Sequence, residues 1–209
     1  MALFILGGIW DRAIQIRVPG DQRLGLAYLS AIALGLLLFA AIHPRRSFDV
    51  RPGLSLRELG EALGAVAVLA AAAVPLGLVV GFLHWEPRWL GWSYALARIL
   101  GLVVFVGLPE EMLFRGVFQE AFSRFWTPRT GWLLASVLFG LTHIVKHARL
   151  QGWWHAPLAA AATLNWRYAL LATVAGLAYG WVYRRTGKLA AAAVTHGAVD
   201  WLWSTWLGS

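Results

Sequence analysis

The chain has 209 residues, of which 59% are hydrophobic and 13% are charged, and its mean hydropathy is +0.63. Soluble domains have about a quarter of their residues charged, so this chain cannot cover a water-facing surface and much of it must face lipid. The net charge of +8 comes from basic residues that lie between apolar runs, which is typical of membrane loops and argues against a nucleic-acid partner. The sequence contains no cysteine, so it can form neither a disulfide framework nor a thiolate metal site.

The N-terminal part is predicted to hold two membrane spans after an interfacial segment. Residues 1–22 mix apolar and charged residues and match a signal peptide poorly, so we expect an amphipathic helix at the membrane surface. Residues 24–42 and 62–83 are runs of 19 and 22 residues without a charge. A transmembrane helix needs about 20 such residues, so the two runs predict a transmembrane hairpin over residues 23–98.

Residues 99–209 are predicted to form a second unit, a helix bundle that carries the site. Its uncharged runs are shorter and cover residues 99–109, 130–142, 168–183 and 189–199. Such runs suit either core helices of a soluble domain or spans that carry polar groups into a bundle, and the two long upstream runs favour the spans. Many of the 13 tryptophans lie near the ends of these runs, as in interfacial belts. The predicted fold is all-α, a multi-pass transmembrane bundle of about six spans, in which residues 150–166 form a re-entrant loop, a further span or a cap.

Two adjacent glutamates follow the first of these runs. Pro109 is favoured at the first position of a helix, so Glu110 and Glu111 are expected in the first helical turn, where the helix dipole stabilises negative charge. Glu111 and Arg115 are four residues apart, so they share a face and can form an ion pair. Glu110 lies about 100° further round the helix, which leaves its carboxylate available. The alternative for Glu110 is an ordinary helix-start residue in an exposed loop.

Histidines occur in two of the later runs. Phe139 and His143 are four residues apart and predict one stripe on a helix, as do His196 and Asp200. An aspartate in that position could orient the imidazole of His196. Each pair could instead simply join helices in the core. Ionisable groups at membrane depth cost free energy, however, so a functional site is the default interpretation.

Together these groups have the chemistry to activate water. A carboxylate can act as a general base, and imidazoles can stabilise an oxyanion. Glu110, His143 and His196 could alternatively hold Zn²⁺ with an open position for water. No pair of them has a known zinc spacing, and the residue after His143 is isoleucine, not the glutamate of a His-Glu-x-x-His motif. We therefore expect no cofactor and keep zinc as the alternative.

Three motifs in chain order resemble those of the CPBP intramembrane proteases, the CAAX protease and bacteriocin-processing family. They are Glu110-Glu111-x-x-x-Arg115, Phe139-x-x-x-His143 and His196-x-x-x-Asp200, and the likeness covers roughly residues 100–207. The resemblance implies a membrane-embedded hydrolase, a glutamic peptidase that carries out intramembrane proteolysis.

The resemblance also implies a role for each matching residue. Glu110 would activate the attacking water, and His143 would hold that water or share its proton. His196 and Asp200 would stabilise the oxyanion, while Glu111 and Arg115 would form a supporting ion pair. An ionised aspartate cannot donate a hydrogen bond, so Asp200 is either protonated or serves to orient His196. The supporting set also includes Phe139.

The implied partners are the lipid bilayer and a membrane-associated peptide or protein substrate. A composition rich in Ala, Gly, Arg and Trp is compatible with a bacterial source, so the expected location is the bacterial inner membrane and the expected role is processing of an exported or membrane-anchored peptide. Two non-enzymatic alternatives stay open. One is a membrane scaffold or immunity protein built on such a bundle, and the other is a proton-coupled transporter whose buried Glu, His and Asp relay protons.

Overall fold

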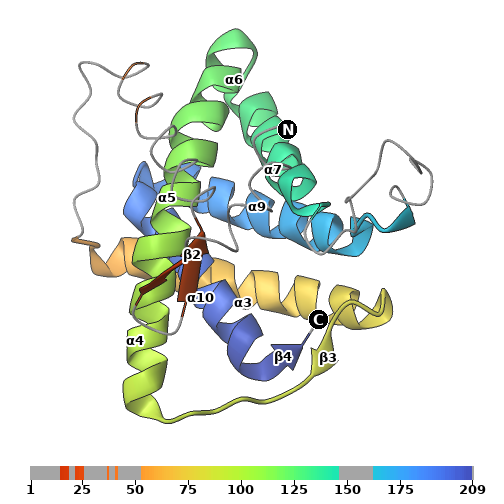
Figure 1. Ribbon diagram of the computed structural model, residues 1–209. Coiled ribbons are helices and arrows are strands. Elements are labelled where there is room, and N and C mark those ends of the chain that lie inside the picture. The colour runs from red at the N-terminus through yellow and green to blue at the C-terminus, as the bar shows by residue number, and fades with distance from the viewer. Residues whose placement is uncertain are drawn as a thin grey trace.

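The computed structural model describes residues 15–18, 22–25, 37, 41, 53–145 and 162–208 of the chain. These residues are mostly helical, as expected (Figure 1). Two helices among them, Leu56–Val79 and Trp92–Phe125, are long and apolar enough to cross a membrane. Only 28% and 22% of their most apolar windows are buried inside the protein, so most of the surface of both helices faces outward. The other spans of the expected six remain a prediction.

The described residues near the N-terminus form a small sheet. Strands β1 (Gln15–Val18) and β2 (Gln22–Gly25) pair antiparallel, with Ile16 opposite Leu24. The fold is therefore not purely α-helical, and the expected amphipathic helix is wrong for this stretch, because its polar and apolar residues alternate with the period of a strand. Strand β2 also takes the first two residues of the predicted span 24–42. Two further residues of that span are described as helical, and the others lie outside the described residues.

Helix α3 (Leu56–Val79) contains most of the second predicted span and begins before the uncharged run. Ser55 starts this helix with a capping box. Its Oγ accepts the Glu58 N–H at 3.3 Å, and the Glu58 carboxylate accepts the Ser55 N–H at 2.7 Å. Beyond the helix, β3 (His84–Trp85) pairs antiparallel with β4 (Leu207–Gly208), which joins the chain after α3 to the C-terminal end of the bundle.

One long continuous helix follows and carries the first predicted motif in its middle (Figure 1). It consists of three α-helical parts separated by two π-helical segments. In chain order these are α4 (Trp92–Leu102), η1 (Val103–Gly107), α5 (Leu108–Glu111), η2 (Met112–Gln119) and α6 (Glu120–Phe125). Single π-helical turns inside α-helices are rare and occur frequently at functional sites.

Pro109 does not begin a new helix, so the expected placement of Glu110 and Glu111 at a helix start is wrong. Proline lacks an N–H, and in a regular α-helix its ring clashes with the carbonyl four residues earlier. The π-helical segment just before it ends with a bond from the Leu108 N–H to the Val103 carbonyl, five residues back. This wider turn lets the helix continue through the proline, and both glutamates project from its middle.

The three later uncharged runs are confirmed as helices. They are α7 (Pro128–His143), α9 (Trp166–Thr186) and α10 (Leu189–Trp206). Thr127 and Asn165 cap α7 and α9, and each side-chain oxygen accepts a backbone N–H of the first turn at 3.1 Å. Gly187 ends α9 in the left-handed conformation, with a φ of 69°. Of the stretch 150–166, residues 150–161 lie outside the described part of the chain.

Helix α9 lies in the middle of the described bundle and packs against α3, α7 and α10. The main apolar core joins α3, η2, α7 and α9 through one cluster of buried side chains, which are Leu69, Phe114, Phe139, Ala172 and Tyr179. Helix α10 also packs against α3 and against the long helix, and it thereby connects the two apolar helices.

Two glycines let α10 and η1 approach each other closely. A Cβ atom on Gly107 would lie 2.7 Å from the Ala193 carbonyl oxygen, and one on Gly197 would lie 2.8 Å from the Val103 Cα. Small residues at helix contacts allow such backbone approach, and a larger side chain here would push the two helices apart. Gly197 directly follows His196, so this contact sets how deeply that imidazole reaches toward the glutamates.

Candidate active site

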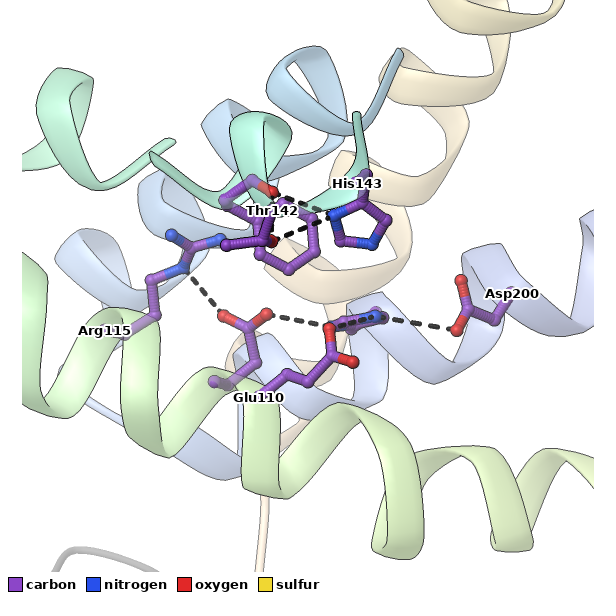
Figure 2. Close-up of polar contacts among 8 residues, drawn as sticks. Glu110, Arg115, Thr142, His143 and Asp200 are labelled. Carbon is purple, nitrogen blue, oxygen red and sulfur yellow. Dashed lines mark hydrogen bonds and ion pairs between the residues drawn. The ribbon is translucent and has the colours of Figure 1, made fainter. Parts of the chain in front are cut away.

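The four residues predicted as catalytic line one cavity of about 120 Å³. Glu110 comes from α5, His143 from the end of α7, and His196 and Asp200 from α10. Figure 2 shows Glu110 on the long helix, Asp200 on a second helix, and His143 approaching from a third. Helix packing thus brings together side chains from all three motifs.

At the edge of this cavity, His196 joins Glu111 and Arg115, which lie behind the lining, in a group that we call the buried triad. Glu111 Oε2 accepts a hydrogen bond from Arg115 Nε at 2.7 Å, and Glu111 Oε1 lies 2.9 Å from His196 Nδ1. The Glu111 and Arg115 side chains are fully buried, and only 4% of the His196 side chain is exposed. The expected Glu111–Arg115 ion pair is therefore present. The contact between Glu111 and His196 was not predicted, because the two are 85 residues apart and share no local spacing.

The other ring nitrogen of His196 faces the carboxylates of the cavity. Nε2 lies 3.5 Å from Asp200 Oδ2 and 3.8 Å from Glu110 Oε2. An ionised carboxylate only accepts hydrogen bonds, so the contact with Glu111 requires that Nδ1 of the imidazole carries a hydrogen. A second proton, on Nε2, would lie between Asp200 and Glu110. His196 is therefore positioned by Glu111 as well as by the Asp200 that the sequence suggested.

His143 is held by its own helix. Its Nδ1 lies 2.8 Å from the Phe139 carbonyl oxygen and 3.3 Å from Thr142 Oγ1, which itself donates to the same carbonyl at 2.7 Å. A backbone carbonyl accepts only, so Nδ1 carries the hydrogen and Nε2 is the basic nitrogen of the neutral ring. The Phe139 carbonyl thus orients the His143 ring, at the four-residue spacing seen in the sequence.

Aromatic rings fix the two imidazoles from the sides. Tyr179 stacks on His196 with ring centroids 4.5 Å apart, and Phe139 meets His196 edge-on at 5.7 Å. Tyr168 meets His143 edge-on at 4.9 Å. Neither tyrosine is among the residues predicted for the site. The one available signal is their separation of eleven residues on α9, about three helical turns, which places both on one face.

The Arg115 guanidinium lies over two of these aromatic rings, those of Phe139 and Tyr179. Its central carbon is 5.5 Å from the centroid of the Phe139 ring and 6.0 Å from that of the Tyr179 ring. Cations are attracted to the faces of aromatic rings. The buried positive charge is therefore stabilised by Glu111 on one side and by these rings on another.

The remaining cavity wall is apolar and comes largely from α3, α9 and α10, with side chains that include Leu69, Ala73, Leu171, Val199 and Trp203. Among the described residues, no group of three or more His, Asp or Glu side chains has the arrangement of a metal-ion site. The arrangement at the cavity, a carboxylate with two imidazoles beside an apolar wall, can activate a water molecule and stabilise a negatively charged oxygen.

The family model described as type II CAAX prenyl endopeptidase Rce1-like matches residues 91–202 of the chain, which is more than half of its length. The match extends from the start of α4 into α10 and includes all three motifs. No curated protein and no solved structure matches the chain.

Proposed function

Since the chain belongs to the type II CAAX prenyl endopeptidase Rce1-like family, a family of membrane-embedded CAAX proteases, we propose that it is a multi-pass intramembrane endopeptidase of the glutamic type. It cleaves a membrane-associated peptide or protein with a water molecule activated by Glu110. The observation that carries this proposal is the convergence of Glu110, His143 and His196 on one largely apolar cavity.

In the proposed reaction, Glu110 is the general base. Its side chain is 17% exposed and lines the cavity, so it can meet water, whereas the neighbouring Glu111 is fully buried and engaged by Arg115 and His196. Glu110 takes a proton from water, and the water oxygen attacks the carbonyl carbon of the scissile peptide bond. The same proton then passes to the leaving nitrogen as the C–N bond breaks, and Glu110 returns to its ionised form.

His143 positions the attacking water. Because its Nδ1–H points to the Phe139 carbonyl, Nε2 of the neutral ring accepts a hydrogen bond from the water that Glu110 deprotonates. Two acceptors on one water molecule fix its orientation and direct an oxygen lone pair at the substrate carbonyl.

His196 stabilises the oxyanion of the tetrahedral intermediate through Nε2–H. Glu111 holds the Nδ1–H side of the ring, so the form that donates from Nε2 carries a proton on both nitrogens. The Asp200 carboxylate lies 3.5 Å from His196 Nε2, keeps this second proton on the imidazole before substrate binds, and orients the ring. Assigned in this way, Asp200 does not need to donate to the oxyanion itself.

The proposed setting is the inner membrane of a bacterium, where the enzyme processes an exported or membrane-anchored peptide. The apolar cavity wall suits a substrate segment that is itself apolar. Exclusion of bulk water by that wall strengthens the electrostatic interactions of Glu110 and His196 with the reacting atoms.

The test is hydrolysis in H₂¹⁸O by purified protein reconstituted in liposomes with bacterial membrane proteins. Cleavage leaves ¹⁸O in each new C-terminal carboxyl, which mass spectrometry detects. We expect the rate of labelled-terminus formation to fall about 10²–10⁴-fold in Glu110→Gln, because a general base contributes about that much. Glu120→Gln is the matched control, since Glu120 lies on the same long helix, outside the cavity, and accepts from Tyr183. Full-rate cleavage by Glu110→Gln would contradict the proposal.

A metal-free reaction is part of the proposal, and zinc held by Glu110, His143 and His196 is the alternative. We expect cleavage to survive prolonged chelation and metal analysis to find far less than one zinc ion per chain. Loss of cleavage on chelation, restored by Zn²⁺, would establish the zinc-dependent version instead.

A further inference from the structure

A second cavity, of about 140 Å³, lies between the start of α4 and the end of α10 and shares no residue with the cavity at Glu110. Its polar lining consists of two arginines and five neutral residues that can donate hydrogen bonds, and none of the described residues that line it is acidic. These residues are Arg88, Trp89, Tyr94, Arg98, Trp201, Ser204 and Thr205.

Hydrogen bonds to both helices fix the Arg98 side chain, and a backbone hydrogen bond anchors the chain at Arg88. Arg98 Nε donates to Ser204 Oγ at 3.0 Å, and Arg98 Nη1 donates to the Tyr94 hydroxyl at 2.8 Å. The backbone N–H of Arg88 donates to the Thr205 carbonyl at 2.7 Å. The Arg88 guanidinium also pairs with Glu86 at 2.7 Å, outside the lining of the cavity, so the positive charge within the cavity comes chiefly from Arg98. A preformed cavity with an arginine and several neutral donors has the character of an oxyanion site.

Trp201 is an independent sign that this cavity suits a hydrogen-bond acceptor. Its indole Nε1–H is buried and has no hydrogen-bond partner among the described residues, and Trp201 lines this cavity. A buried donor without a partner costs free energy, and native proteins nearly always satisfy such groups. An acceptor oxygen within the cavity would satisfy it.

The surroundings of the cavity identify the source of that oxygen. Trp89 and Trp92 are 40% and 77% exposed beside it, as expected for tryptophans at the headgroup level of a membrane. From Trp92 an exposed apolar stripe continues along the long helix at intervals of four residues through Leu96, Leu100 and Val104, which are 61%, 63% and 48% exposed. A charged pocket at the head of an apolar stripe matches the two parts of a phospholipid.

We propose that this cavity binds the phosphate of an anionic phospholipid, with the acyl chains along the stripe from Trp92 to Val104. Arg98 pairs with the phosphate, Arg88 lies beside it, and the Trp201 indole N–H donates to one of its oxygens. An inorganic phosphate ion offers the same oxygens, but it cannot use the apolar stripe.

The test is native mass spectrometry of the full chain in mild detergent, titrated with phosphatidylglycerol, with phosphatidylcholine of the same acyl chains, or with inorganic phosphate. Wild-type protein should bind phosphatidylglycerol more tightly than phosphatidylcholine, and an equal concentration of inorganic phosphate should not displace it. Arg98→Gln should weaken phosphatidylglycerol binding about tenfold or more, because a hydrogen bond to a charged group is lost. Arg167→Gln is the matched control, since Arg167 lies beside Trp166 and lines neither cavity.

A second variant separates binding from folding. Arg98 joins α4 to α10, so its loss can disturb the bundle, whereas Trp201→Phe removes only a donor that has no partner in the described protein. Trp201→Phe should retain wild-type thermal stability without lipid and bind phosphatidylglycerol about threefold more weakly. The proposal is overturned if Trp201→Phe binds this lipid as tightly as wild type. It is also overturned if phosphatidylcholine binds equally well, or if inorganic phosphate displaces the lipid at equal concentration.

Discussion

Two carboxylates in this protein are each held between an arginine and a histidine, one in the core and one at the surface. In the buried triad, Glu111 lies 2.7 Å from Arg115 and 2.9 Å from His196, and the side chains of Glu111 and Arg115 are fully buried. At the surface, Glu86 has the same two kinds of partner at nearly the same distances.

In this surface triad, Glu86 Oε2 lies 2.7 Å from Arg88 Nη2 and 3.0 Å from His84 Nε2. The three residues are close in sequence, and about half of each side chain is exposed to solvent. The chemistry of the two triads is therefore alike, while burial and sequence separation differ. Burial decides what the loss of a partner costs, because water can replace the partner at the surface and cannot do so in the core.

The largest effect is expected from removing Glu111, the carboxylate of the buried triad. Glu111→Ala leaves the Arg115 charge buried without its partner, so we expect the free energy of unfolding to fall by about 3–5 kcal/mol. Glu86→Ala is the matched surface variant and should leave stability unchanged within error, because exposed ion pairs contribute little. Reversible unfolding in mixed micelles measures both. Equal losses in the two variants would show that burial is not what separates the triads.

A smaller effect is expected from the close helix approach that positions His196. Gly197→Ala places a methyl group against the Val103 backbone, so we expect a loss of about 1–3 kcal/mol from overpacking, together with slower cleavage as the imidazole is displaced. Gly64→Ala on α3 is the control, because no atom lies within 4 Å of its added Cβ. That variant should be neutral, or more stable by about 0.5–1 kcal/mol, because alanine favours a helix over glycine. If Gly197→Ala changes neither stability nor cleavage, the buried triad tolerates movement of α10.

The smallest effect concerns the acid behaviour of the surface triad. Hydrogen bonds from Arg88 first, and then from His84, lower the pKa of Glu86 below its usual value of 4.5. A lowered pKa means that the contribution of Glu86 to stability is present above pH 4.5 and is lost as the pH falls through the lowered value. The ¹³C shift of the Glu86 carboxyl measures this midpoint. About 1 M salt should move the midpoint back toward 4.5, because exposed charges are screened, and a midpoint unaffected by salt would contradict this account.

Much of the candidate site could be predicted from sequence because its parts are local. Glu111 with Arg115 and Phe139 with His143 each follow a four-residue spacing, and that spacing survives even where the helix becomes π-helical. The prediction fails at Pro109. Proline is favoured at the start of a helix, but here a wider π-helical turn directly before Pro109 lets the helix continue through a residue that has no N–H to donate.

The predicted amphipathic helix is wrong over Gln15–Val18 for a different reason. The helix is expected there because residues 1–22 mix apolar and charged residues, whereas the alternation of polar and apolar residues over Gln15–Val18 has the period of a strand. Apolar content predicts which residues avoid water, whereas only the periodicity of those residues distinguishes a helix from a strand.

The amino-acid sequence alone determined that this protein is apolar and helical, and which side chains carry its ionisable chemistry, because hydrophobicity and helical spacing act over a few residues. Tertiary structure alone decided that Glu111, not Glu110, is buried against His196, that Tyr179 stacks on that imidazole, and that Arg98 and Ser204 meet at a second cavity. These contacts join residues that are 17, 85 and 106 positions apart, well beyond a helical turn. Their formation depends on how closely whole helices pack, which no local pattern encodes.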